Sequence, residues 1–245
     1  LNVKPVELQV NPEKLKQTKP TTHLRPYDVP YHLRKGFEAE LLEMLEAGLI
    51  EQCTSPTDWN TKAFPVPKSS DPTKCRIVGD FRGLNNILLK LYWHTESSHQ
   101  LLRHIDPQAK YFCVIDATSA FHQVPVSAEA SKLLTIVTNA GRYSYKVLPQ
   151  GVCNSSALWN ILTDGNSRID SELQILKNMD DYLIYGRSLE ELEKKLEKFM
   201  VFAKEKNLKL SPNKFFISEE VEFGGSVVSS ETVSYTHLTL PTIAK

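Results

Sequence analysis

The segment Ile175-Leu176-Lys177-Asn178-Met179-Asp180-Asp181-Tyr182-Leu183-Ile184-Tyr185 contains two short apolar runs that only Asp180-Asp181 separates. Runs of this length and composition are typical of β-strands, and the separator has the length of a tight hairpin turn. Adjacent carboxylates at a hairpin tip repel each other, so packing alone gives no reason to place them there. A divalent cation held between them and a third carboxylate would give such a reason.

A third carboxylate is available at Asp116, which ends another apolar run, Tyr111 to Ile115. A strand-end aspartate together with an acidic hairpin is the layout that two-metal phosphoryl transfer requires. The alternative is an ordinary polar turn, because aspartate is also favoured in turns for local reasons. For an isolated Asp-Asp pair the polar turn would be the better interpretation, but other segments of this chain argue against it.

Composition excludes several classes of protein. With 245 residues the chain is long enough for one large domain or two small ones, and 29 basic residues balance 29 acidic ones, so net charge gives no sign of a nucleic-acid partner. No signal peptide and no apolar stretch long enough to cross a membrane is present, so we expect an intracellular, soluble protein. The cysteines are far apart, form no Cys-x-x-Cys pair, and favour a reducing compartment over a zinc site or disulfide framework; they are Cys53, Cys75, Cys113 and Cys153.

The order of the expected elements favours an α+β fold. Residues 1–35 are rich in proline and predict an extended leader, and an amphipathic helix with Phe37, Leu41 and Leu45 on its apolar face should follow and end at Gly48. Around the aspartates the order is strand, helix, strand hairpin, helix, strand. Helices that cover one face of a mainly antiparallel sheet are related to the ferredoxin-like split βαβ arrangement.

The last segment, residues 233–245, resembles a translated library adapter and not biological sequence. We therefore expect the genuine sequence to stop near Thr232, where the reading frame is cut and not terminated, and leave residues 233–245 out of the fold prediction.

Five ordered motifs resemble the reverse transcriptase domain of Ty3/gypsy-type long-terminal-repeat retrotransposons, from about Tyr31 to Ser230. Each motif alone would be weak, but their order and spacing make chance implausible. They are Cys75-Arg76-Ile77-Val78-Gly79-Asp80-Phe81-Arg82-Gly83-Leu84-Asn85, Ile115-Asp116-Ala117-Thr118-Ser119-Ala120-Phe121-His122-Gln123, Leu148-Pro149-Gln150-Gly151, Asn178-Met179-Asp180-Asp181, and Leu208-Lys209-Leu210-Ser211-Pro212-Asn213-Lys214 leading into Glu222-Phe223-Gly224-Gly225.

The resemblance implies the fingers and palm of a right-hand polymerase. The fingers would be residues 36–89 and 124–154, and the palm, a ferredoxin-like antiparallel sheet backed by helices, would be residues 90–123 and 155–232. The thumb and RNase H segments of the family would be absent. We therefore expect the chain alone to bind duplex weakly and to dissociate after few additions.

The implied activity is RNA-directed and DNA-directed DNA synthesis by a segment of a retrotransposon polyprotein. Two Mg²⁺ ions, with Mn²⁺ as a substitute, would be held by Asp116, Asp180 and the backbone carbonyl of Ala117, with Asp181 coordinating less directly. The implied partners are an RNA or DNA template with its primer, dNTPs and other segments of the polyprotein, and no membrane. The implied location is the cytoplasm, in a virus-like particle, or the nucleus.

The resemblance also assigns residues around the nucleotide. Lys68 and Arg76 would hold the triphosphate, Phe121 would be the steric gate against a 2′-hydroxyl, and Gln150 would touch the nucleotide. Lys214 is a candidate proton donor to pyrophosphate. Each assignment has a simpler alternative. Lys68 and Arg76 would then be solvated cations on a hairpin, Phe121 a core aromatic residue, and Lys214 an ordinary surface lysine.

Template and primer residues are implied by three further motifs. Asp80 and Arg82 would face the template, and Gly151 would let the backbone approach it. Phe223 and Gly224 resemble the hairpin that grips the primer end, where glycine suits close backbone approach.

The chain departs from the family pattern at three places: Asn178 stands where an aromatic residue is usual, Asn154-Ser155-Ser156 replaces Asn-Ala-Pro, and Trp93-His94-Thr95 replaces a proline-rich turn. None of these removes a carboxylate. Two other functions stay open: a nucleotidyl cyclase, which would not need the template-facing motifs, and a catalytically inactive nucleic-acid-binding relic of such an element.

Overall fold

The structure is a computed structural model that describes residues 1–19, 21–55, 57, 59–68, 71–164, 175–212 and 215–230. The chain forms two compact units, and each is built from segments that are far apart in the sequence. The first unit comprises Leu1–Asn2, Tyr92–Ala120 and Trp159–Lys245, and the second comprises Val3–Leu91 and Phe121–Leu158. Their assignment as palm and fingers stays a prediction. Within the described residues, no helix is long and apolar enough to cross a membrane.

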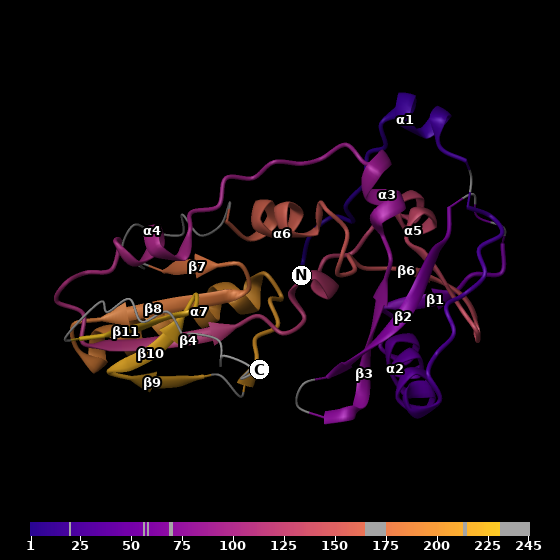
Figure 1. Ribbon diagram of the computed structural model, residues 1–245. Helices are drawn as coiled ribbons and strands as arrows, with labels where there is room; N and C mark the ends of the chain where they lie inside the picture. Colours follow the sequence, from indigo (N-terminus) through magenta and orange to yellow (C-terminus); the bar gives the residue numbers. More distant parts are fainter. Residues whose placement is uncertain are drawn as a thin grey trace, which may run out of the picture. The chain divides into compact units, whose positions relative to one another are not determined.

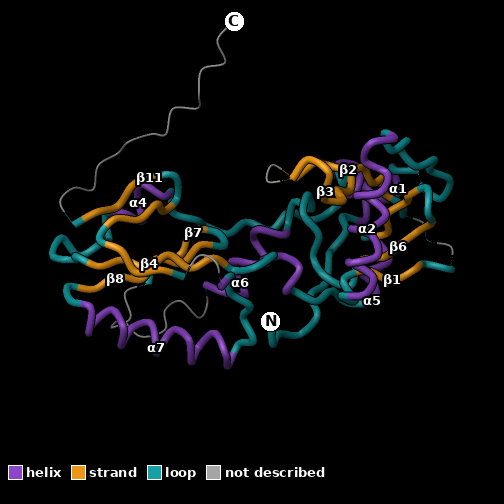
Figure 2. Tube along the Cα trace, turned by 90° about the horizontal axis from the view of Figure 1, so that it is seen from below, coloured by secondary structure: helices purple, strands orange, loops and turns teal. Residues whose placement is uncertain are grey.

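A four-stranded antiparallel sheet forms the centre of the first unit, with strand order β7-β8-β4-β9 (Figure 1). Helix α7 lies along one face of this sheet, and the β10–β11 hairpin and α4 lie on the other (Figure 2). The elements are α4 (Ser98–Leu102), β4 (Tyr111–Asp116), β7 (Leu176–Asn178), β8 (Asp181–Gly186), α7 (Leu189–Glu205), β9 (Phe216–Ser218), β10 (Glu220–Phe223) and β11 (Ser226–Ser229).

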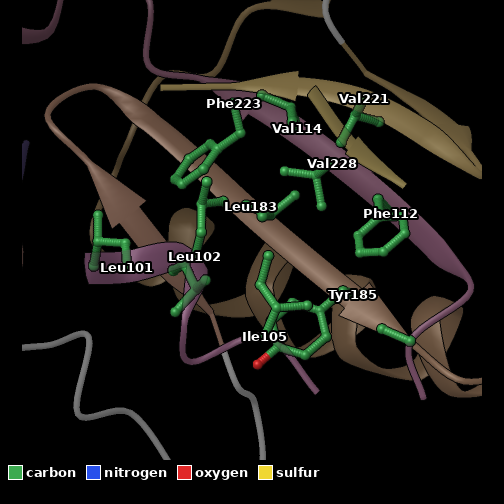
Figure 3. Close-up of a cluster of buried hydrophobic side chains, with 12 residues drawn as sticks. Leu101, Leu102, Ile105, Phe112, Val114, Leu183, Tyr185, Val221, Phe223 and Val228 are labelled. Atoms are coloured by element: carbon green, nitrogen blue, oxygen red, sulfur yellow. The ribbon is translucent and has the colours of Figure 1, made fainter. Parts of the chain in front are cut away.

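Because side chains alternate along a strand, β4 and β8 send apolar residues to both faces of the sheet. One set meets α7, where the rings of Tyr182 and Phe199 lie 5.1 Å apart. The other set forms a core with α4 and the β10–β11 hairpin (Figure 3). This core comprises Leu101, Leu102, Ile105, Ala109, Phe112, Val114, Leu176, Leu183, Tyr185, Val221, Phe223 and Val228.

The acidic hairpin is present, but its turn lies one residue earlier than predicted. Met179 and Asp180 are the turn residues, and Asp181 is the first residue of β8, paired with Asn178. This register follows from the packing: it directs Leu183 and its alternate neighbours to the core and Tyr182 to α7. The cost is a left-handed backbone at Met179, with φ of 58°.

The second unit contains a five-stranded sheet with strand order β1-β6-β5-β2-β3, in which only β2 and β5 run parallel. Its strands are β1 (Ile50–Gln52), β2 (Thr61–Lys68), β3 (Asp71–Gly79), β5 (Thr135–Thr138) and β6 (Gly141–Tyr145). The structure also describes the helical elements α1 (Pro12–Gln17), η1 (Tyr31–Leu33), α2 (Arg34–Glu46), α3 (Arg82–Ile87), η2 (Ala120–Gln123), α5 (Ala128–Leu133) and α6 (Ser155–Asp164).

The predicted amphipathic helix is confirmed as α2, which ends just before Gly48, a residue with φ of 67°. Its buried face uses Met44 where we predicted Leu45. The leader is not wholly extended, because it contains α1. It also packs into the second unit: Val6 pairs with Val126, and Leu8 is buried.

Candidate active site

The strand register brings the predicted acidic residues together in the first unit. Asp116, the last residue of β4, is the direct cross-strand partner of Asp181. Directly opposed residues project from the same face of a sheet, here the face that carries the β10–β11 hairpin. The backbone N–H of Ala117 donates to the carbonyl of Asp180 at 2.8 Å. All three aspartates therefore lie at one end of one strand pair.

The segment Leu208–Ser211 forms backbone hydrogen bonds with the end of β4, on the side away from β8. The N–H of Ser211 donates to the Asp116 carbonyl at 2.7 Å, and the N–H of Thr118 donates to the Lys209 carbonyl at 3.0 Å. Neither of these bonds uses the carbonyl of Ala117, the predicted backbone ligand. This part of the fifth motif therefore has a structural role, since it fixes Asp116 between two neighbouring segments.

Carboxylate oxygens are the donors that Mg²⁺ prefers, so the chemistry of Asp116, Asp180 and Asp181 fits a divalent cation. Across the part of the chain that the structure describes, no three His, Cys, Asp or Glu side chains are grouped closely enough to hold a metal. The support for a cation site is therefore the backbone pairing that brings the three aspartates to one strand end, and which atoms bind the ion stays a prediction.

Side chains from α6 brace the acidic hairpin, and our sequence analysis missed them. Trp159 is fully buried, and its Nε1 donates to the carbonyl of Met179 at 2.8 Å, which holds the strained turn. Lys177 Nζ donates to Asn160 Oδ1 at 2.7 Å. A tryptophan and an asparagine on a helix after the Leu-Pro-Gln-Gly motif were visible in the sequence, but nothing there connected them with residues 177–179.

The prediction that the Phe223 side chain contacts the primer is wrong. Its ring is 1% exposed and belongs to the core of the first unit (Figure 3), so the side chain cannot face a primer. Its place in β10 positions the following turn, where Gly224 has φ of 58° and Gly225 has φ of 78°. Any contact with a primer would thus come from the turn.

We expect Phe223→Ala to lower the free energy of unfolding by about 3–5 kcal/mol, because it leaves a cavity in a closely packed core. Urea denaturation measures this loss. Phe216→Ala is the matched control, since Phe216 is 56% exposed on the edge strand β9. Equal losses in the two variants would contradict the core assignment.

In the second unit, Asp80, Arg82 and Gly151 line a groove of about 610 Å³. Arg82 forms a bidentate ion pair with Asp80, with both N···O distances 2.7 Å. The hydroxyl of Tyr27, from the leader, also donates to Asp80, at 3.3 Å. The Tyr27 ring packs edge-on against that of Phe64 at 6.1 Å, and both rings line the groove. No sequence motif had pointed to these two aromatic residues.

The loop that carries Gly151 is held by Asn85. Asn85 Nδ2 donates to the Gly151 carbonyl at 2.8 Å, and Asn85 Oδ1 accepts from the N–H of Cys153 at 2.9 Å. Gly151 has φ of 94°, a conformation that residues with a side chain rarely adopt. Asn85 ends the first quoted motif, but its partner was not predictable without the fold.

The predicted nucleotide residues also belong to the second unit. Lys68 Nζ forms an ion pair with Glu40 Oε2 at 2.9 Å. Arg76 is exposed on β3, Gln150 is exposed, and Phe121 is half-buried in η2. Partial exposure of Phe121 is compatible with the predicted gate. Their roles stay predictions. Lys214 and residues 233–245 lie outside the described residues.

The ion pair with Arg82 holds the pKa of Asp80 at about 2, below its ordinary 3.8. Since the pKa is depressed in the folded state, the pair stabilises the fold above about pH 4, and this contribution is lost as pH falls through about 2. In Arg82→Gln the pKa of Asp80 should rise toward 3.8, measured by carboxyl ¹³C NMR titration. Arg76→Gln should leave it unchanged; an unshifted pKa in Arg82→Gln would rule out the ion pair as the main cause.

Comparison with known proteins decides the family. The family model described as reverse transcriptase (RNA-dependent DNA polymerase) matches residues 66–232. This chain belongs to the reverse transcriptase family. The resemblance inferred from the five motifs is thereby confirmed at the level of the family, and the Ty3/gypsy subtype stays a prediction. Enzymes of this family generally depend on divalent metal ions.

The reverse transcriptase domain is similar to segments of longer proteins. It is 30% identical over 224 residues to the retrovirus-related Pol polyprotein from transposon 297 of Drosophila melanogaster, covering 87% of this chain and 21% of that protein. It is 26% identical over 232 residues to the polyprotein from transposon opus of the same species, covering 93% and 23%. It is 30% identical over 179 residues to the Gag-Pol polyprotein of walleye dermal sarcoma virus, covering 71% and 10%. The chain thus spans less than a quarter of these relatives.

Solved structures confirm the α+β polymerase fold of this reverse transcriptase domain. The foamy viral protease-reverse transcriptase in complex with double-stranded DNA superposes with a TM-score of 0.81 at 22% identity, covering 94% of this chain and 38% of that one. The same viral enzyme in complex with an RNA/DNA hybrid gives a TM-score of 0.80 at 23% identity, covering 94% and 29%. The predicted α+β polymerase fold class is therefore confirmed, while the residue ranges given to fingers and palm stay a prediction.

Proposed function

We propose that this reverse transcriptase domain is an RNA-directed and DNA-directed DNA polymerase that transfers a nucleotide from a dNTP to a primer 3′-hydroxyl. The observation that carries the proposal is the register that opposes Asp116 to Asp181 and hydrogen-bonds Ala117 to Asp180. Clustered carboxylates at a strand end are what phosphoryl transfer with two divalent ions needs. Membership of the reverse transcriptase family supports the same activity.

Asp116 and Asp180 would hold two Mg²⁺ ions, with the carbonyl of Ala117 and with Asp181 in a less direct role. Ions held there would supply a lower pKa for the attacking hydroxyl and stabilisation of the negative charge on the leaving pyrophosphate. In the second unit, Lys68 and Arg76 hold the triphosphate by charge, and Lys68 must exchange its partner Glu40 for phosphate oxygens. Gln150 contacts the nucleotide, and Phe121 rejects a 2′-hydroxyl by steric clash. Lys214 is the candidate proton donor.

The groove of the second unit is the proposed template site. Arg82 gives two of its N–H groups to Asp80, and because its side chain is 85% exposed, its remaining N–H groups could donate to a phosphate backbone. Tyr27 and Phe64 offer aromatic surface on which an unpaired base can stack. The positive φ at Gly151 permits a close approach of the backbone. Complexes of the similar foamy viral enzyme with double-stranded DNA and with an RNA/DNA hybrid support nucleic acid as the partner.

The primer-extension reaction tests the proposal. The chain is mixed with a primed RNA or DNA template, all four dNTPs and Mg²⁺, and the lengthened primer is separated by electrophoresis. Extension on both templates supports the proposal. Binding of the primed template without any extension, over a range of Mg²⁺ and Mn²⁺ concentrations, would instead indicate a catalytically inactive relic. We further propose that the domain works beside other segments of a Pol polyprotein, in a cytoplasmic virus-like particle or in the nucleus.

A further inference from the structure

A hydrogen bond between two segments of the first unit lies directly beside the acidic turn. Asn178, the last residue of β7, donates through Nδ2 to the hydroxyl of Ser98 at 3.1 Å. Ser98 is the first residue of α4, and both side chains are half-buried. Asn178 precedes the turn residues Met179 and Asp180. The bond therefore joins α4 to the strand end that carries a predicted catalytic carboxylate.

Gly224, in the turn of the β10–β11 hairpin, packs against the two side chains that form this bond. A Cβ atom added to Gly224 would lie 2.6 Å from Ser98 Oγ and 2.7 Å from Asn178 Nδ2. Distances this short leave no room for any side chain at that position. Gly224 thus contacts both partners of the bond at once. Three segments meet here: α4, the acidic hairpin, and the turn that was predicted to hold the primer end.

Two further hydrogen bonds along residues 177–179 come from α6 and do not involve the β10–β11 turn. Lys177 is held by Asn160, and the carbonyl of Met179 is held by the Trp159 indole. Those contacts brace the acidic hairpin from α6. Of these three hydrogen bonds, the Asn178–Ser98 bond is the one that also touches the β10–β11 turn, and behind it the two hairpins are held together by the core that Phe223 shares with Leu176 and Leu183.

We propose that Ser98 and Asn178 are positioning residues that set the primer 3′-end, held at the Gly224 turn, in reach of Asp180. The inference deepens the proposed polymerase function and rests on it. Misplacement of reacting groups by about 1 Å can cost about 10²-fold in rate, so loss of this bond should slow the chemical step.

The test is single-turnover incorporation of one dNTP on a primed template by the chain. Ser98→Ala and Asn178→Ala should each lower the maximal rate by about 10-fold, and Gly224→Ala by about 10²-fold, with the dNTP concentration at half-maximal rate changed by less than about 3-fold. The reciprocal double variant Ser98→Asn with Asn178→Ser keeps one amide and one hydroxyl, so it should recover most of the rate. Ser97→Ala is the matched control, because it removes the cap of α4 but not the bond.

Two results would overturn the inference: an equal slowing in Ser97→Ala, or a reciprocal variant no faster than the single variants. Amide hydrogen exchange gives a readout without catalysis. The exchange rates of the Asp180 and Asp181 amides should be higher in Ser98→Ala than in the wild type, and in the reciprocal variant they should return to the wild-type rates. Unchanged rates in Ser98→Ala count against the proposal. If the wild type incorporates nothing, the polymerase proposal fails, and the exchange data still decide whether the bond positions the hairpin.

Discussion

Asp180→Asn and Asp116→Asn should each reduce nucleotide incorporation by at least about 10³-fold, because each replaces a metal-binding carboxylate at the proposed reaction centre. The fold should persist, since Asp116 ends a strand, Asp180 lies in the hairpin turn, and both lie outside the core. Without metal the variants should be as stable as the wild type or slightly more stable, because a charge is removed from a cluster of like charges. Single-turnover kinetics and thermal unfolding measure the two effects.

Metal addition gives a second signature of the same site. In the wild type, Mg²⁺ should raise the unfolding midpoint by mass action, and this rise should shrink in either variant. Glu222→Gln is the matched control, because Glu222 is an exposed carboxylate on β10 of the same unit. Incorporation that survives in Asp116→Asn or Asp180→Asn would remove the two-metal assignment. A loss of incorporation in Glu222→Gln of similar size would show that the effect is not specific.

Phe121→Val should raise the use of ribonucleotides relative to deoxyribonucleotides by about 10²-fold or more, because it removes a steric barrier and leaves no polar group unpaired. Phe121 is half-buried in η2 and not part of a closed core, so shortening the side chain leaves a gap at an accessible surface. The measured quantity is the ratio of kcat/KM for a dNTP to that for the matching rNTP.

The control for this prediction is Phe202→Val, which shortens a half-buried ring on α7 of the first unit. It should leave the sugar preference unchanged. An unchanged preference in an active Phe121→Val enzyme would mean that the gate is another residue and that Phe121 serves packing.

Much of the fold could be predicted because its signals are local. The apolar runs before Asp116 and around Asp180-Asp181 form β4, β7 and β8. Helix α7 begins after Ser188, whose hydroxyl accepts from the N–H of Glu191 three residues later, a spacing that is typical of a capping box. The reciprocal contact differs from a capping box, since Glu191 accepts from the N–H of Arg187. The one-residue error in the acidic turn arose because register depends on which face each side chain must bury.

The amino-acid sequence by itself determined the family, the α+β class and the three aspartates, because strand periodicity and ordered motifs are properties of neighbouring residues. Only the tertiary structure decided which distant groups meet. It opposed Asp116 to Asp181, put the Phe223 ring into the core, and placed Ser98 against Asn178. Such contacts depend on the register and packing of segments that are far apart in the sequence, where many pairings are compatible with the same local pattern and burial selects one.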